Sequence, residues 1–226
     1  MELSKHDWKF NHHVVPIFDD HISKSVPFYK EIHKMINNIS GWFIRENTNV
    51  YDIGSSTGTL LNRLSNTYNK EVNYIGLDNS DDMVLASNNL SPRVTIELTD
   101  VTEGYIFKNS SLITSVLTLQ FIREDLRQKV INNVYQGLNN GGAFIFIEKV
   151  LGNDAKFNEM WADLYHDLKM ENGLSKEHIF DKSRAIRGVS NPITVKENIH
   201  MLEKSGFNKI DIFFKWNNFT GIIAIK

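Results

Sequence analysis

Cysteine is absent from the 226-residue chain, which excludes disulfides, thiolate nucleophiles and cysteine metal ligands. No apolar run approaches the roughly 20 residues that a membrane-spanning helix needs, and the first residues, Met1 to Asp7, lack the apolar core of a signal peptide. A formal net charge of −2 provides no overall attraction to nucleic acid. These absences predict a cytoplasmic protein that acts on a small molecule, without membrane association or direct nucleic-acid binding.

Proline is also scarce, with four residues, whereas hydrophobic residues make up 41% of the chain and can form a sizeable core. We therefore expect one domain over residues 1–226. After an N-terminal helical cover (1–46), short apolar runs alternate with amphipathic runs, which predicts an α/β fold with a mostly parallel, helix-covered sheet. Residues 152–192 are expected to form a helical insertion or lid.

Seven apolar runs are the predicted strands: Asn49–Ile53, Val72–Leu77, Val94–Leu98, Ser111–Val116, Ala143–Lys149, Lys209–Lys215 and Gly221–Lys226. Apolar side chains at helical spacing predict a helix over Asp125–Leu138, and the turn residues Asn139–Gly142 are expected to end it. The connection Trp216–Phe219 is too short for a parallel crossover, so the last strand should run antiparallel.

Two glycines, Gly54 and Gly58, follow the first predicted strand, and Asp78 ends the second. The glycines let the backbone turn tightly and approach a ligand, which a Cβ atom would obstruct. An acid in the position of Asp78 can accept hydrogen bonds from both hydroxyls of a ribose. The spacing predicts a nucleoside-binding crevice, although a turn of this kind also occurs where it serves helix–strand packing alone.

Ser55, Ser56 and Thr57 are expected to cap the next helix and to present N–H groups that favour a carboxylate. The turn departs from the pattern G-x-G-x-x-G, which argues against a nicotinamide dinucleotide because a pyrophosphate needs the close approach that the middle glycine allows. A single nucleoside with an amino-acid tail fits better. That description indicates S-adenosylmethionine.

Further candidates for chemistry lie in the second half of the chain. His166 can act as a base and Tyr165 can orient an acceptor, although both also suit a helix surface that packs an insertion. Glu148 and Lys149 end a strand at the crevice edge, where they either contact substrate or form a solvated ion pair. The pair His12–His13 lacks a recognised ligand spacing, so no metal site is predicted.

Several segments together resemble the carboxy-S-adenosylmethionine synthase family, within the class I methyltransferases. The segments are Ile17–Ile22, Lys24–Tyr29, Tyr51–Gly54, Leu77–Ser80, Leu117–Phe121, Tyr135–Asn139, Gly141–Ala143, Glu148–Lys149, His166–Lys169 and Ser205–Phe207. The resemblance implies a Rossmann-like class I methyltransferase fold, S-adenosylmethionine as cofactor (or S-adenosylhomocysteine or carboxy-S-adenosylmethionine bound), and a homodimer.

The resemblance also implies eight cofactor contacts. They are Tyr29, Gly54, Ser55, Ser56, Asp78, Asn79, Asp100 and Val101. Tyr29 would cover the methionine end, while Asp100 and the Val101 N–H would bind adenine. From the local sequence alone, Tyr29 also suits a half-buried core aromatic and Asp100 a helix cap.

Two departures from the family bear on the reaction. Val116 stands where the family has an asparagine that contacts the cofactor. Ser183 stands where the family has an arginine for the carboxylate of the product, with Arg184 beside it and Arg187 one helical turn further. Because a shift of one residue rotates a side chain by about 100° on a helix, Arg184 does not automatically replace that arginine.

The sequence therefore predicts a class I S-adenosylmethionine-dependent transferase that methylates a small molecule, with Tyr165, His166 and Arg184 as candidate catalytic residues. One alternative is carboxy-S-adenosylmethionine synthesis from prephenate for tRNA wobble-uridine modification. Two further alternatives are a cofactor-binding protein without turnover and a direct tRNA methyltransferase, which would need a basic groove.

Overall fold

The computed structural model describes residues 18–226 and side chains from residue 22 onward. The helices are α1 (Phe18–Ser25), α2 (Tyr29–Ser40), α3 (Thr59–Thr67), α4 (Asp81–Ala86), α5 (Glu124–Gly137), α6 (Ala155–Glu171), α7 (Lys176–Ala185) and α8 (Val195–Ser205). Two short 3-10 helices are η2 (Val101–Glu103) and η3 (Leu119–Phe121). The strands are β1 (Thr48–Ile53), β2 (Val72–Asp78), β3 (Val94–Leu98), β4 (Ser110–Val116), β5 (Leu138–Lys149), β6 (Lys209–Trp216) and β7 (Phe219–Ile225).

The strands form one seven-stranded sheet in the order β3-β2-β1-β4-β5-β7-β6. The five strands β3, β2, β1, β4 and β5 are parallel to one another, and β7 runs antiparallel to both β5 and β6. The predicted Rossmann-like fold and terminal hairpin are therefore confirmed. Asn217, with φ of 41°, provides the left-handed residue in the hairpin turn.

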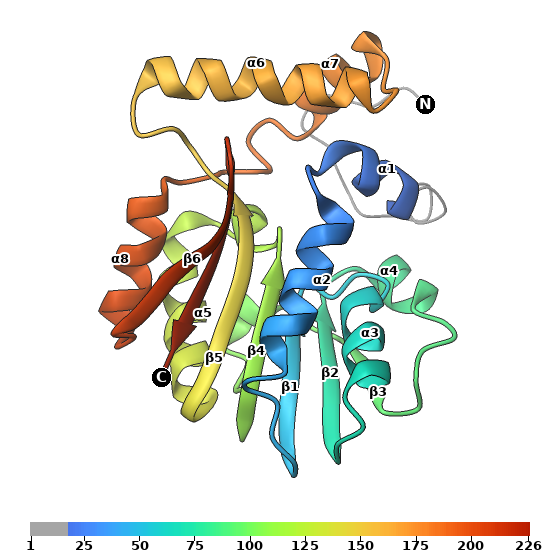
Figure 1. Cartoon of the computed structure of the whole chain (residues 1–226), viewed down its shortest axis with the longest axis vertical. Coiled ribbons are helices and arrows are strands. Elements are labelled where there is room, and N and C mark those ends of the chain that lie inside the picture. Colours follow the sequence, from blue (N-terminus) through green and yellow to red (C-terminus); the bar gives the residue numbers. More distant parts are fainter. Residues whose placement is uncertain (1–17) are drawn as a thin grey trace.

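Helices cover both faces of the sheet, with α2 and α3 on one side and α5 and α8 on the other (Figure 1). The alternation of β5 shows how the sequence builds this arrangement. Phe144 and Phe146 pack in the core under α5, whereas Ile145 and Ile147 pack in the core under α2 and α3. Successive side chains of a strand point to opposite faces, so a nearly continuous apolar run fills two cores.

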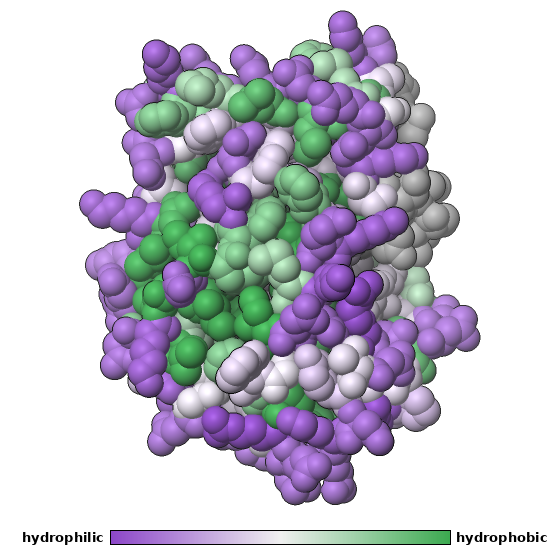
Figure 2. Space-filling model, in the orientation of Figure 1, coloured by the Kyte–Doolittle hydropathy of each residue, from purple (hydrophilic) through white to green (hydrophobic). Residues whose placement is uncertain are grey.

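One part of the sheet has less cover. Figure 2 shows hydrophobic residues gathered over the region of β5, β7 and β6, beside α2. The partly buried residues of β6 and β7 that pack against the core on this face are Phe213, Phe214, Trp216, Ile223 and Ile225.

The prediction of a separate turn after α5 is wrong. Strand β5 begins at Leu138, directly after the helix, and includes Asn139–Gly142. The pairing with β4 shifts register between Ser110 and Leu112, and Gly141 has φ of +73°. The polar residues and glycines thus form an irregularity inside the strand, which absorbs the extra residues without leaving the sheet.

Residues 152–192, for which the sequence predicts an insertion, contain two helices, α6 and α7, that lie beyond the carboxyl ends of the parallel strands (Figure 1). The two ends of this segment are joined at the base, where the Leu151 N–H donates to the Ile193 carbonyl (3.0 Å) and Leu151 bridges to Thr194. The predicted N-terminal cover contributes α1 and α2, and residues 1–17, including His12–His13, lie outside the described part. No helix in residues 18–226 is long and apolar enough to cross a membrane.

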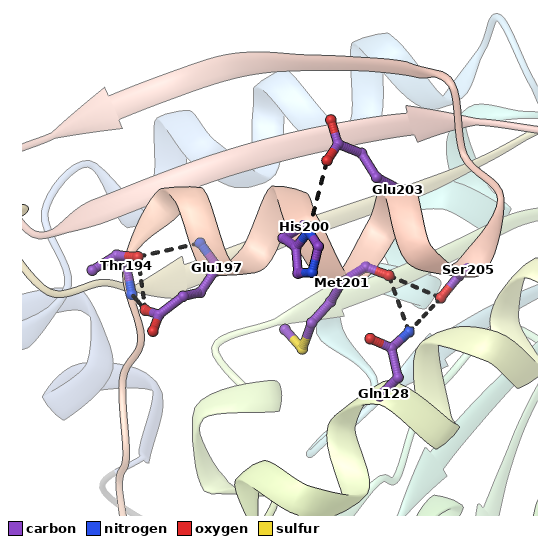
Figure 3. A network of polar contacts seen from close by, with 7 residues as sticks. All are labelled: Gln128, Thr194, Glu197, His200, Met201, Glu203 and Ser205. Carbon is purple, nitrogen blue, oxygen red and sulfur yellow. Dashed lines mark hydrogen bonds and ion pairs between the residues drawn. The ribbon is translucent and has the colours of Figure 1, made fainter.

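Helix α8 begins with a reciprocal cap (Figure 3). The Thr194 N–H and hydroxyl both donate to Glu197 Oε2 (2.7 Å each), and the Glu197 N–H donates to Thr194 Oγ1 (3.2 Å). Further along, Gln128 Nε2 of α5 donates to Ser205 Oγ (2.8 Å) and the Met201 carbonyl (3.1 Å). The two contacts fix where α8 starts and how it packs on α5.

Thr194→Ala is expected to lower the free energy of unfolding by about 1 kcal/mol, because it leaves the Glu197 N–H without its acceptor and removes the hydroxyl that donates to Glu197 Oε2. The hydrogen bonds from Thr194 hold the pKa of Glu197 below its ordinary value. The stability that ionised Glu197 contributes is therefore present above the pKa of the unfolded state, and it is lost as the pH falls through the pKa of the folded state. Urea titrations of wild type and variant at about pH 7 and about pH 3 should show a difference that shrinks in acid.

The matched control is Glu203→Gln on the same helix. Glu203 is 60% exposed and lies 4.0 Å from His200 Nδ1, so its loss should change stability little (Figure 3). Equal destabilisation by the two substitutions would contradict the capping role.

Candidate active site

The turn after β1 enters the left-handed region three times, the last time at Gly58 with φ of +76°. Gly54 has φ of +69° and Ser56 has φ of +50°. The N–H groups of Gly54 and Ser55 both donate to the Leu77 carbonyl of β2 (2.7 and 3.1 Å), which fixes the turn against that strand. A Cβ atom on Gly54 would overlap the side chain of Thr118, so this position requires glycine.

The predicted caps of the following helix are wrong. Helix α3 starts at Thr59 with Gly58 as its N-cap, and no side chain caps it. Ser56 instead donates its hydroxyl to Met83 Sδ (3.3 Å), while Thr57 Oγ1 lies 3.1 Å from Thr59 Oγ1. Because the backbone is left-handed at several positions in this turn, helical conformation begins only after the two serines, which therefore cannot cap the helix.

Asp78 closes the crevice from β2. Its Oδ2 accepts the Ser56 N–H (2.8 Å) and its Oδ1 accepts the Ser80 N–H (2.9 Å), so the carboxylate joins the glycine turn to the start of α4. Burial raises the pKa of Asp78, against the effect of these N–H donors. Each carboxylate oxygen has a second lone pair, which leaves acceptors for two hydroxyl groups.

Asp100 is a helix cap, as the local sequence allows, and its position also leaves it at the wall of the crevice. It is the N-cap of η2, with Oδ1 accepting from the Thr102 N–H (2.8 Å) and hydroxyl (2.7 Å), and it also lines the crevice. Val101 follows it and is buried. Capping occupies one carboxylate oxygen only, so Oδ2 stays in position for a ligand donor.

A cavity of about 250 Å³ unites these groups at the carboxyl ends of the strands. Six of the eight predicted cofactor residues line it: Gly54, Ser56, Asp78, Asn79, Asp100 and Val101. The structure does not bring the other two to its wall. Ser55 is buried, and the ring of Tyr29 lies 4.3 Å from that of His33.

The loop after β4 forms another wall and is held by one buried carboxylate. Glu148 accepts the N–H groups of Thr118 (3.1 Å), Leu119 (2.8 Å) and Gln120 (2.9 Å). Leu117, which precedes them, has φ of +58°. Burial raises the pKa of Glu148 to about 8 despite these donors. Glu148 therefore positions the cavity wall rather than forming the solvated ion pair considered from the sequence.

Arg127 supports the same loop from α5. Its side chain is 1% exposed and donates to the carbonyls of Ile122 (2.8 Å), Gln120 (3.3 Å) and Asn191 (2.6 Å). Since Asn191 ends the insertion, the arginine ties that segment to the cavity wall. Nothing in the local sequence of an amphipathic helix distinguishes such an arginine from a surface one.

The end of the cavity under the insertion is basic. Lys149 of β5, Lys169 of α6 and Lys182 of α7 line it, together with Tyr165. The ammonium groups of Lys169 and Lys149 lie 3.9 and 5.1 Å from the centre of the Tyr165 ring. Burial and the neighbouring lysines lower the pKa of Lys169 to about 7, and burial with Lys149 lowers that of Lys182 to about 8.

Sequence reasoning missed Lys169 and Lys182. The only local signal is the spacing of Tyr165 and Lys169, four residues apart and therefore on one face of a helix. Their significance comes from elements that the chain brings together only in three dimensions.

The three predicted catalytic residues occupy different environments. Tyr165 is buried and lines the cavity, with its ring 5.2 Å from that of Phe219. His166 is exposed and lies outside the lining. Arg184 also lies outside it, with its guanidinium 5.3 Å from the centre of the Phe180 ring. Ser183, in contrast, does line the cavity.

The residues present fit S-adenosylmethionine. Beside the two acids for the adenosine part, Gln120 lines the cavity and donates Nε2 to the Leu117 carbonyl (3.2 Å), while its buried Oε1 has no partner. Such an acceptor suits an ammonium group. Among the side chains described, from residue 22 onward, no group of three or more acidic or histidine side chains is arranged to hold a metal ion.

Comparisons with known proteins agree with this geometry. A family model described as "Methyltransferase domain" matches residues 50–142. An O-methyltransferase family protein from Burkholderia thailandensis superposes with a TM-score of 0.66 at 14% identity, over 96% of this chain and 60% of the other. Haemonchus contortus phosphoethanolamine N-methyltransferase 2, in complex with S-adenosylmethionine, gives 0.62 at 15% identity over 87% and 52%. Fold and site together define a class I S-adenosylmethionine-dependent transferase.

Full-length relatives narrow the class. The chain is 52% identical to the carboxy-S-adenosyl-L-methionine synthase of Staphylococcus epidermidis over 100% of both chains. It is 37% identical to that of Methylococcus capsulatus, over 97% of this chain and 94% of the relative. The chain belongs to the carboxy-S-adenosyl-L-methionine synthase family.

Proposed function

We propose that the protein converts S-adenosylmethionine into carboxy-S-adenosylmethionine with prephenate as the carboxylate donor. The observation that carries the proposal is the division of the cavity, which has Asp78 and Asp100 at one end and three lysines at the other. Acids suit the hydroxyls and amino group of an adenosine, and a basic end suits a donor and a product that both carry carboxylates.

When bound, S-adenosylmethionine supplies a methyl carbon activated by the sulfonium. Replacing one methyl hydrogen by a carboxylate removes a proton and adds CO₂. Prephenate balances this exchange by losing CO₂ and hydroxide, which takes up the proton as water, and it leaves as an aromatic 2-oxo acid. The part of the protein is to hold the two reactants in line and to exclude water.

Methyl transfer to a small acceptor is the second candidate, and two residues favour it. Val116 and Ser183 both line the cavity, at the positions where the family carries an asparagine and an arginine. Methyl transfer does not place a new carboxylate on the sulfonium, so it needs no cation at position 183. The lysines offset this argument because they supply positive charge from three other positions.

Mass spectrometry of the nucleosides after incubation with S-adenosylmethionine and prephenate tests the proposal. The expected product is an adenosyl compound heavier by one CO₂, which takes the isotope when the ring carboxylate of prephenate carries ¹³C. Unmodified S-adenosylmethionine throughout would overturn it and favour methyl transfer. Tight cofactor binding without any transfer would favour a non-catalytic role, and a salt-sensitive complex with tRNA would favour direct tRNA methylation.

We further propose that α6 and α7 act as a lid over the cavity and that the protein is located in the cytoplasm. We also propose that it forms a homodimer. Phe157, Met160 and Leu164 of α6 are 49%, 41% and 45% exposed, and their spacing places them on one helix face. An apolar stripe of this kind suits a second copy. Light scattering should give the mass of a dimer for wild type and of a monomer for Leu164→Asp. A monomeric wild type would exclude the homodimer.

A further inference from the structure

Two lysines converge on one tyrosine at the basic end of the cavity. Lys149 ends β5, Lys169 lies near the end of α6, and the Tyr165 ring lies within 5.1 Å of both ammonium groups. The two lysines are distant in the sequence, so the sheet and the insertion must pack together to bring them there.

Burying these cations has a cost that the described residues do not offset. Lys169 is 7% exposed, and transfer of an ammonium out of water costs several kcal/mol even after relaxation. The Tyr165 ring returns roughly 0.5–2 kcal/mol. Among the side chains that the structure describes, from residue 22 onward, no carboxylate lies at ion-pair distance from Lys149 or Lys169, and the charges that act on Lys169, those of Lys149 and Lys182, have the same sign. A site of this kind gains stability when an anion enters.

We infer that Lys149 and Lys169 form the carboxylate-binding subsite for the anionic co-substrate, with Tyr165 holding the two ammonium groups apart. The inference rests on the proposed function and names its residues. Two point charges from different elements suit a molecule with two separate carboxylates, whereas a single arginine suits one planar carboxylate held bidentately. The subsite thus explains how the site tolerates serine at position 183.

Anion binding should then be coupled to proton uptake. The described titratable groups around Lys169 are Lys149 from β5, Lys182 and His178 from α7, and Tyr165 and His166 from α6. In the absence of an anion, Lys169 is only partly charged near neutral pH because its pKa is about 7. A bound carboxylate favours the charged form, so affinity should fall as the pH rises above about 7.

Calorimetric titration of prephenate into protein saturated with S-adenosylhomocysteine measures this without turnover, because that nucleoside has no methyl group to react. Lys169→Met and Lys149→Met are each expected to weaken prephenate binding at least about tenfold and to leave S-adenosylhomocysteine affinity unchanged. Wild type should take up protons on binding near pH 7, seen as different heats in HEPES and Tris buffers, and Lys169→Met should not.

Lys156→Gln provides the matched control, because Lys156 is exposed on the same helix as Lys169. Thermal unfolding of Lys169→Met tests whether Lys169 has only a structural role. If the substitution removes an unpaired buried charge, Tm should stay equal or rise. If it removes a structural contact, Tm should fall. Equal prephenate affinity in wild type and both variants would overturn the subsite even if the carboxylated product forms. Binding of malonate but not prephenate, lost in both variants, would support the subsite and overturn the proposed donor.

Discussion

Asp78→Asn is expected to weaken binding of S-adenosylhomocysteine about 100-fold, equivalent to about 2.7 kcal/mol. The substitution removes the charge that strengthens hydrogen bonds to two ribose hydroxyls, and charge-assisted bonds are worth about 1.5–3 kcal/mol each. It also turns an amide NH₂ toward either the Ser56 or the Ser80 N–H, both of which now donate to the carboxylate. Isothermal titration calorimetry measures the change directly.

Asp81→Asn is the control, because Asp81 lies three residues further on, is exposed and starts α4. It should leave nucleoside affinity within about twofold of wild type, since the effect of a helix dipole charge is about 0.3–1 kcal/mol and acts on stability. If Asp78→Asn bound the nucleoside as tightly as Asp81→Asn, the assignment of Asp78 to the ribose would fail.

Gly54→Ala should be the most destabilising single methyl addition in the turn after β1. The left-handed φ of +69° costs alanine about 1–2 kcal/mol. The new Cβ would lie 2.8 Å from the Thr118 Cβ, and such overpacking adds about 1–3 kcal/mol. With about 2–4 °C per kcal/mol for a domain of this size, Tm should fall by roughly 10 °C in a thermal melt.

Gly173→Ala separates the two contributions. Gly173 has φ of +86° and no atom within 4 Å of the position of an added Cβ, so it reports the backbone cost alone. The double variant Gly54→Ala/Thr118→Gly should recover the packing part relative to Thr118→Gly alone. Equal losses of Tm for Gly54→Ala and Gly173→Ala would show that the contact with Thr118 carries no energy.

The sequence predicted those parts of the site that depend on neighbours along the chain. Gly54 and Asp78 are marked by a turn and a strand end within one βαβ unit, and the structure joins them through the Ser56 N–H. The positions of the apolar strands were equally predictable, because the pattern of a β-strand depends only on neighbouring residues. The same reasoning failed for the caps of α3, since a left-handed Ser56 leaves no signal in its own side chain.

The roles that the sequence did not reveal depend on contacts between distant segments. Glu148 acts through backbone N–H groups about 30 residues earlier, as the spacing to Thr118 records, and no side-chain pattern marks a loop that needs them. The pKa of Lys169 is lowered by its burial and by Lys149 of β5 and Lys182 of α7, which are brought near it only in the folded chain. Periodicity identifies a helix face but does not identify what will lie opposite to it.

The closed base of the insertion has an evolutionary consequence. Because the backbone bond from Leu151 to Ile193 brings the two ends together, the chain passes from β5 to α8 as though the intervening residues were a short loop. Length changes in that segment therefore cost little loop-closure entropy and leave in place the hydrogen bonds between Asp78 and the turn after β1. Descendants of such a gene can change the molecule that meets the cofactor without first rebuilding the part that holds it.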